Sequence, residues 1–206
     1  MIEVIIIIII IIIIINHVIS LLASDNNLLK GRWSLLRKRG SIMSMAKLPV
    51  AELRIGNYVV CVKNRLAEGG FGYVDLVYDA SSKVEYVLKR AGIERNEVYE
   101  VVKKEISILQ RYAGPHLVKL LASEVIVLSK GKREACLLLE LCPGGHLLDR
   151  ISSREGKHLP PPSLYRIFGQ LLLAIQPMHE SNPPVTHRDL KLENILFGAV
   201  YQRSYP

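Results

Sequence analysis

A nine-residue segment near the end of the chain brings together side chains that suit phosphoryl transfer. It reads Thr186-His-Arg-Asp-Leu-Lys-Leu-Glu-Asn194. The carboxylate of Asp189 can accept a proton from a hydroxyl group while orienting it, and Lys191 can neutralise charge on a transferring phosphoryl group. Asn194 offers a hard amide oxygen of the kind that Mg²⁺ accepts. The segment therefore predicts two catalytic residues, Asp189 and Lys191, and one metal ligand, Asn194.

A lysine in an apolar strand pattern points to the same chemistry. Glu85-Tyr-Val-Leu-Lys-Arg90 has the β-branched and aromatic composition of a strand, and Lys89 lies within it. A lysine buried on a strand needs an anionic partner. The helix expected over residues 97–111 carries Glu105 on its apolar side. Taken alone, each residue is more often a surface charge, but a Lys–Glu pair between strand and helix would position the α- and β-phosphates of a nucleotide.

A glycine-rich turn between two strand patterns could cover those phosphates. Leu66-Ala-Glu-Gly-Gly-Phe-Gly-Tyr-Val74 separates a strand expected over residues 58–65 from one expected over residues 75–79. Gly69 and Gly72 would let backbone N–H groups approach phosphates where a Cβ would clash. By itself, a glycine-rich hairpin is more often only a turn.

Taken in order, these motifs resemble the protein kinase superfamily over residues 54–198. The pattern His-Arg-Asp-Leu-Lys-x-x-Asn is the catalytic loop of that superfamily, and the lysine two positions after Asp189 is typical of serine/threonine-specific members. Within the superfamily, the chain is similar to the Numb-associated kinases, the group of the adaptor-associated and cyclin-G-associated kinases. The segments that carry this likeness are Ile55-Gly56, Leu66 to Phe71 with alanine at position 67, Leu88 to Arg90, Leu137 to Gly145 and Pro183 to Leu196.

The resemblance implies an α+β, protein-kinase-like fold that binds ATP and Mg²⁺. Leu139 would be the gatekeeper, and backbone groups of Glu140 and Cys142 would hydrogen-bond adenine at the hinge. Proteins would accept the phosphoryl group, and the subgroup implies clathrin-adaptor subunits and endocytic traffic. On the matching positions, the residues expected to surround the nucleotide are Leu66, Ala67, Gly69, Gly70, Gly72, Val74, Lys89 and Glu105.

The same resemblance predicts how the kinase part is divided. Residues 53–142 are expected to form a complete β-rich N-lobe with the hinge, and residues 143–206 an incomplete helical C-lobe. A helix expected over residues 164–178 should fray at its last turn because of Pro177. Its predicted buried side consists of Ile167, Phe168, Leu171, Leu172 and Ile175.

The kinase motifs stop after the catalytic loop. Residues 195–206 contain neither the Asp-Phe-Gly motif, whose aspartate would be the second Mg²⁺ ligand, nor Ala-Pro-Glu. Asn194 alone makes a poor Mg²⁺ site, so we expect these 206 residues on their own to be inactive in phosphoryl transfer. Two alternatives stay open: a truncated pseudokinase that binds nucleotide or partners, and a gene-model fragment without a stable product.

A low-complexity segment over residues 1–23 is dominated by isoleucine, which fills positions 5–15 without interruption. Three interpretations remain open: a membrane anchor over residues 4–23, a signal peptide, and a simple repeat without selected function. Residues 24–52 form a basic linker, and its Lys and Arg residues would place the kinase part on the cytoplasmic side of an anchor.

The composition argues against several other classes of protein. The net charge is +8, but no arginine-rich helix carries base-reading side chains, so nucleic acid is not an expected partner. The cysteines at positions 61, 136 and 142 lack the spacing of zinc ligands or of a disulfide framework. A reducing, cytoplasmic compartment fits this cysteine usage.

Overall fold

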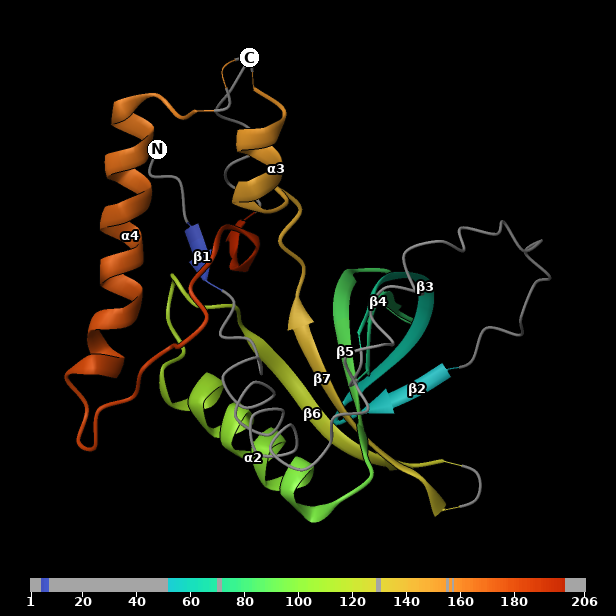
Figure 1. Ribbon diagram of the computed structural model, residues 1–206. Helices are drawn as coiled ribbons and strands as arrows, with labels where there is room; N and C mark the ends of the chain where they lie inside the picture. The colour runs from blue at the N-terminus through green and yellow to red at the C-terminus, as the bar shows by residue number, and fades with distance from the viewer. Residues whose placement is uncertain are drawn as a thin grey trace, which may run out of the picture.

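The dominant element of the chain is an antiparallel sheet of six strands (Figure 1). The computed structural model describes residues 5–7, 52–69, 72–128, 131–154, 156 and 158–198. The strand order across the sheet is β2-β3-β4-β5-β7-β6, so β5 pairs with β7 and β6 lies at the edge. The strands are β2 (Glu52–Ile55), β3 (Tyr58–Gly69), β4 (Gly72–Asp79), β5 (Glu85–Ile93), β6 (Leu120–Val127) and β7 (Arg133–Glu140).

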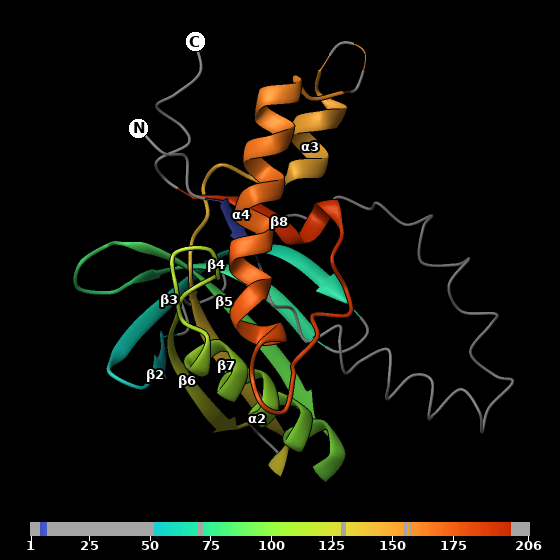
Figure 2. The ribbon, with the colours of Figure 1, turned by 90° about the vertical axis from the view of Figure 1, so that its left-hand side faces the viewer.

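One helix lies against this sheet, and two others stand beyond it (Figures 1 and 2). The first, α2 (Asn96–Arg111), joins β5 to β6. After β7 come α3 (Leu147–Ser152) and α4 (Pro161–His179), and the 3-10 helix η4 (Leu192–Asn194) leads directly into β8 (Ile195–Phe197). β8 pairs antiparallel with β1 (Ile5–Ile7) in a second, two-stranded sheet. The architecture is therefore α+β, as the sequence predicts.

Apolar cores lie on both faces of the six-stranded sheet. Successive side chains of a strand point to opposite faces, so Leu138 of β7 packs with Leu88 on one face, while Leu137 and Leu139 pack toward α2 on the other. Strands buried on both sides read as continuous apolar runs, which explains the composition of β7. The core away from α2 consists of Ile55, Val60, Val77, Leu88, Cys136 and Leu138.

The elements expected from the sequence are present with longer bounds. The patterns over residues 58–65, 75–79 and 85–90 form β3, β4 and β5, and the helix expected over residues 97–111 is α2. Each strand extends by several residues because ladder pairing continues past its most apolar part, as between Gly69 and Gly72 at the end of β3 and β4.

Helix α4 differs from its expected form in two ways. It continues to His179 although Pro177 lies inside it, because a proline in the last turn removes a single intrahelical hydrogen bond. Phe168 and Leu172, expected on the buried side, are 59% and 48% exposed. The buried stripe instead follows positions i, i+3, i+7 and i+11, which are Ile167, Gln170, Ala174 and Met178.

The exposed face of α4 is apolar over much of its length. Besides Phe168 and Leu172, it includes Leu164, Tyr165 and Leu173, each at least half exposed. Among the described ranges, no helix combines the length and hydropathy that crossing a bilayer requires. The candidate anchor over residues 4–23 lies outside these ranges except for β1, and the linker over residues 24–52 lies outside them except for Glu52.

The turn after β7 is bound to β8. The Gly144 N–H donates to the carbonyl of Phe197 and the Phe197 N–H donates to the carbonyl of Gly145, each at 3.0 Å. A Cβ on Gly144 would lie 2.5 Å from the Cβ of Phe197, so the close approach requires glycine. The ring of Phe197 is buried, with the Arg150 guanidinium 4.1 Å from its centroid. These contacts fix the start of the helical part against the strand that follows the catalytic segment.

Candidate active site

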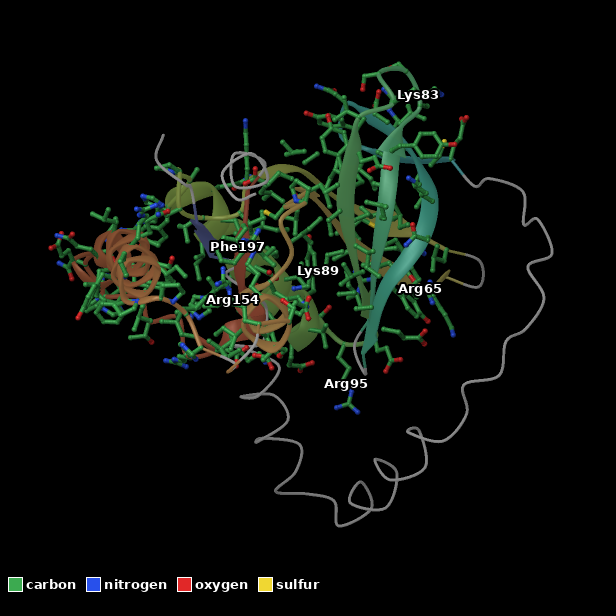
Figure 3. The ribbon with its side chains drawn as sticks, turned by 90° about the horizontal axis from the view of Figure 1, so that it is seen from above. Arg65, Lys83, Lys89, Arg95, Arg154 and Phe197 are labelled. Atoms are coloured by element: carbon green, nitrogen blue, oxygen red, sulfur yellow. The ribbon has the colours of Figure 1, made fainter. Side chains whose placement is uncertain are left out.

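Four side chains form a row across the sheet where the nucleotide is expected. Ala67 lies opposite Val74, Val74 opposite Lys89, and Lys89 opposite Leu137. Directly opposed residues of antiparallel strands project from the same face, so the row is an apolar surface with one cation. Figure 3 shows Lys89 between the sheet and the helical part of the chain. Leu137 is not among the residues singled out from the sequence, because its place follows only from the register of β5 and β7.

The cation of this row is paired with Glu105 of α2. The Lys89 Nζ lies 3.3 Å from Glu105 Oε1, and the two side chains are 18% and 3% exposed. Burial lowers the pKa of Lys89, and the neighbouring carboxylate of Glu105 opposes that shift. An ammonium group has three donors, so one carboxylate leaves capacity for phosphate oxygens. The structure thus brings the predicted strand–helix pair together.

The glycine-rich turn lies at the end of the β3–β4 hairpin. Gly69 and Gly72 form the last pair of its ladder, Leu66 is half exposed, and Gly70 lies outside the described residues. A Cβ on Gly72 would lie 1.8 Å from the carbonyl oxygen of Arg90 in β5. The adjacent strand therefore requires this glycine, a reason different from the approach of phosphates that the sequence suggests.

The expected hinge begins where β7 ends. The Glu140 N–H donates to the Lys119 carbonyl at 3.0 Å, and its carboxylate accepts from the Lys119 N–H at 2.8 Å. Because this N–H is engaged within the sheet, a contact from the Glu140 backbone to adenine would have to come from its carbonyl, which could accept from an adenine amine. Cys142 is buried, and desolvation raises the pKa of its thiol to about 12, so it stays neutral. Leu139 is buried in the core beside α2.

In the catalytic segment, Lys191 and Asn194 meet at one carboxylate oxygen of Asp189. The Lys191 Nζ lies 3.2 Å from Asp189 Oδ2, and the Asn194 Nδ2 donates to the same oxygen at 2.7 Å. The Asn194 Nδ2 also donates to the backbone carbonyl of Asp189 at 2.8 Å. Asn194 is buried, whereas the Asp189 side chain is 16% exposed. The amide of Asn194 therefore holds Asp189 in a position that solvent or a substrate hydroxyl can reach.

The backbone before Asp189 is bent in a way that the sequence does not reveal. Arg188 has a φ of +63°, which lies in the left-handed region that side-chain-bearing residues seldom adopt. The buried His187 accepts the Asp189 N–H through Nδ1 at 3.3 Å. Strained residues of this kind persist where surrounding contacts hold them and often mark functional sites. The bend and the histidine together fix the backbone at Asp189.

The residues present suit a Mg²⁺ ion that is held jointly by the protein and a bound nucleotide, and not one that is held by protein side chains alone. Because its Nδ2 faces Asp189, the amide oxygen of Asn194 is turned away from that carboxylate and could coordinate a cation. Mg²⁺ is commonly held by one or two protein oxygens together with substrate phosphates and water. Within the described ranges, no cluster of three or more His, Cys, Asp or Glu side chains could hold a metal by itself. Asn194 thus fits the role of one protein ligand to a nucleotide-bound Mg²⁺.

Comparison with known proteins finds similarity to protein kinases. The family model for the protein kinase domain matches residues 60–202, which include both Lys89 and the catalytic segment. A probable serine/threonine-protein kinase of Dictyostelium discoideum is 37% identical over 147 residues, covering 70% of this chain and 13% of that protein. The serine/threonine-protein kinase ppk30 of Schizosaccharomyces pombe is 32% identical over 157 residues, covering 75% of this chain and 16% of that kinase.

The chain therefore spans only a small part of the length of these relatives. The part that the family model matches carries most of the sheet, the Lys–Glu pair and the catalytic segment. Serine/threonine kinases of this family are ATP-binding transferases, and the family implies ATP and Mg²⁺. The match over more than half of its residues shows that the chain belongs to the protein kinase family.

Proposed function

We propose that these residues are the nucleotide-binding and catalytic-loop part of a serine/threonine protein kinase, which transfers the γ-phosphoryl group of ATP to protein hydroxyl groups. The observation that carries the proposal is the convergence of Lys191 and Asn194 on Asp189 Oδ2. Such an arrangement suits a reaction in which one carboxylate orients a hydroxyl while a cation and a metal ligand lie beside it.

Each residue of the site has a distinct part in this reaction. Asp189 would accept the hydroxyl proton through Oδ1, since Oδ2 is held by Lys191 and Asn194. Lys191 would neutralise charge on the phosphoryl group during its transfer. Lys89 would bind the α- and β-phosphates, and Glu105 would hold the Lys89 side chain in place. When bound, Mg²⁺ neutralises charge on the β- and γ-phosphates, and Asn194 would supply one of its ligands.

The hinge and two residues of the row, Ala67 and Val74, would bind the nucleoside. The carbonyl of Glu140 and the N–H of Cys142 would pair with adenine, and Val74 and Ala67 would lie on the ring. In this proposal residues 53–142 are the complete N-lobe and hinge, and residues 143–206 are the beginning of the C-lobe. The division is supported by the end of the six-stranded sheet at Glu140.

The finer assignment follows from motif resemblance. Alanine at position 67 and the segments flanking the catalytic loop favour the Numb-associated kinases, and through them clathrin-adaptor subunits as protein substrates. A cytoplasmic location suits such substrates and the three free cysteines. If residues 4–23 anchor the chain in a membrane, the basic linker places the kinase part on the cytoplasmic side.

ATP binding by the 206-residue chain tests the nucleotide site. Isothermal titration should show binding that Lys89→Met weakens at least tenfold, because the ammonium that contacts the phosphates is lost. Lys103→Met is the matched control, since Lys103 is half exposed on α2 and its contacts, with Glu100 and the ring of Tyr99, lie within the same helix. Equal affinity in wild type and Lys89→Met would contradict the proposed site.

Transfer is a separate test, because Asn194 is the one Mg²⁺ ligand that these residues supply to the proposed reaction. We expect the 206 residues on their own to bind ATP without transferring label from γ-labelled ATP, and a longer product that supplies the Asp-Phe-Gly aspartate to transfer it. Asp189→Asn should abolish transfer in the longer product while retaining ATP binding. Label transfer by the 206-residue chain that Asp189→Asn abolishes would show that a second metal ligand is not needed. The second candidate function is a module that binds nucleotide without transferring phosphoryl groups. It is favoured by the same observation, that Asn194 is the one Mg²⁺ ligand supplied here.

A further inference from the structure

The strand β8 has two edges, and they are bound by different parts of the chain. On one edge, both polar backbone groups of Phe197 bond to the turn at Gly144 and Gly145, and His146 forms a bridge opposite Leu196. Backbone groups of successive strand residues point to alternate sides. The N–H and C=O of Leu196 therefore point to the other edge, where β1 lies.

That second edge lies in an apolar setting on both faces of the strand. Ile195 and Phe197 are 4% and 1% exposed and pack with Leu147 and Ile167, whereas Leu196 packs against the main core beside α2. Backbone polar groups in such surroundings must find hydrogen-bond partners. A strand that binds here would have to be apolar on both faces, which a normal alternating strand is not.

The isoleucine run meets this requirement. In β1, Ile5 lies opposite Phe197, Ile6 opposite Leu196 and Ile7 opposite Ile195. β1 also lies alongside α4, as both views show (Figures 1 and 2). By the alternation above, Ile6 and Leu196 form the hydrogen-bonded pair of this ladder.

We propose that the run Ile5–Ile15 is an internal ligand of the β8 edge, which binds as an added strand in several equivalent registers and holds the strand that follows Asn194. Slipping an ordinary strand by one residue moves its apolar side chains to the wrong face. In a run of eleven isoleucines a slip replaces each isoleucine by another, so nothing in the side chains selects the register seen for Ile5–Ile7.

The position of the added strand ties it to the catalytic segment. Ile7 lies opposite Ile195, the residue directly after Asn194, and Asn194 holds Asp189 through two hydrogen bonds. Occupation of the β8 edge would therefore restrict the backbone that carries the proposed metal ligand. This role of the run is distinct from a membrane anchor, because residues paired with β8 are not available to lipid.

Disulfide trapping in the 206-residue chain tests the strand and its register. Opposed residues of a hydrogen-bonded antiparallel pair lie about 5.5 Å apart at Cα, a distance that a disulfide accepts. Ile6→Cys with Leu196→Cys should cross-link under mild oxidation, and so should Ile8→Cys with Leu196→Cys if the register slips by two residues. Ile6→Cys with Ser81→Cys, in the turn after β4, is the control and should not cross-link.

Failure of both Leu196 pairs to cross-link more than the control would overturn the proposal. Cross-linking of the Ile6 pair without the Ile8 pair would overturn the claim that the run binds in several equivalent registers. The wild-type cysteines at positions 61, 136 and 142 are buried and free, so they offer little competition.

Hydrogen exchange at the Leu196 amide gives an independent measurement. Proline lacks the N–H that a ladder needs, but a slip bypasses a single proline, so Ile6→Pro should change the exchange rate by less than about threefold. Prolines at positions 6, 9, 12 and 14 leave no three consecutive isoleucines and should speed exchange at least tenfold. Valine at the same four positions is the matched control and should preserve protection.

The amide of Leu138 in β7 reports in the same experiment whether each variant keeps its fold. Protection of Leu196 that survives the four prolines would overturn the proposal, as would protection lost together with that of Leu138. Vesicles of phosphatidylcholine and phosphatidylserine provide a last arm. If they remove the protection of Leu196 in the wild-type chain, the run belongs to lipid and not to β8.

Discussion

The pair of Lys89 and Glu105 makes a quantitative prediction about stability. The substitution Glu105→Leu keeps the side chain apolar and of similar size but removes the partner of a largely buried ammonium. Lys89 must then either keep its proton without a nearby anion or lose it. Both outcomes cost free energy in the folded state and nothing in the unfolded chain, so the variant should be destabilised.

The size of the loss follows from two estimates. At 3.3 Å and an effective dielectric constant of about 20, the two charges attract by roughly 5 kcal/mol. The cost is limited by deprotonation, however, because a lysine can fold as the neutral amine at ~1.4 kcal/mol for each pH unit below its unfolded pKa. With an unfolded pKa of 10.5, that limit is about 4 kcal/mol at pH 7.5. We expect Glu105→Leu to lose about 3–4 kcal/mol there, as buried pairs do when one partner is removed.

The pH dependence of the loss has a definite sign. If the folded variant holds Lys89 as the neutral amine, the unfolded chain binds one proton more than the folded one. Its stability relative to wild type then rises with pH for as long as Lys89 of the folded wild type keeps its proton, and it becomes constant above the pKa of that lysine, which burial places below 10.5. Within the pH range in which wild-type Lys89 stays protonated, the deficit should shrink by ~1.4 kcal/mol for each pH unit.

Urea denaturation of the 206-residue chain and its variants at several pH values measures this. Lys89→Met combined with Glu105→Leu should recover most of the loss, because it leaves no buried charge. Glu100→Leu is the control, since its partner Lys103 is exposed on the same helix and such pairs contribute less than about 1 kcal/mol. A deficit that does not change with pH, or a double variant as unstable as Glu105→Leu alone, would refute the reasoning.

Three further outcomes are expected. Asp79 accepts hydrogen bonds from Ser81 and Ser82 that lower its pKa to about 2, so the free energy of unfolding should fall as the pH drops from about 4 to 2. In urea titrations, Asp79→Asn should make this fall with pH shallower, and an unchanged fall would contradict the assignment. Gly144→Ala should cost about 1–3 kcal/mol by forcing its Cβ into Phe197, whereas Gly92→Ala, with open space around it, should cost less than about 1 kcal/mol in the same assay. Leu88→Ala should cost about 3–5 kcal/mol by thermal or urea unfolding, because it removes a fully buried side chain from the core away from α2, and a loss under about 1 kcal/mol would contradict that packing.

Much of the site could be predicted because its chemistry is local in the sequence. Asp189, Lys191 and Asn194 lie within six residues, and the structure brings them to one carboxylate oxygen. The pairing of Lys89 with Glu105 was also within reach, since a strand lysine followed by an amphipathic helix leaves few other partners. The α+β class follows from the resemblance to protein kinases that these motifs carry.

Features that depend on long-range contacts could not be predicted in this way. The sequence gives no sign that Gly72 is required by Arg90 of β5, or that Leu137 joins the row beside Lys89. The left-handed backbone of Arg188 is held by its surroundings and not by residue type. Helix α4 carries apolar residues around much of its circumference, so periodicity alone could not show which of them are buried. Phe168, expected on the buried side, is therefore found exposed.

The hydrogen bonds between the Gly144–Gly145 turn and Phe197 limit where the chain can bend. Because the turn is hydrogen-bonded to the edge of β8, it must move together with β8, the strand that follows Asn194. Glu140 is likewise fastened to Lys119 at the other end. Rotation of the sheet relative to the catalytic segment is therefore confined to the peptide units between Glu140 and Gly144. A pivot this short, with Pro143 stiffening one of its torsions, would convert small changes at Leu141 and Cys142 into a swing of the whole sheet over the nucleotide.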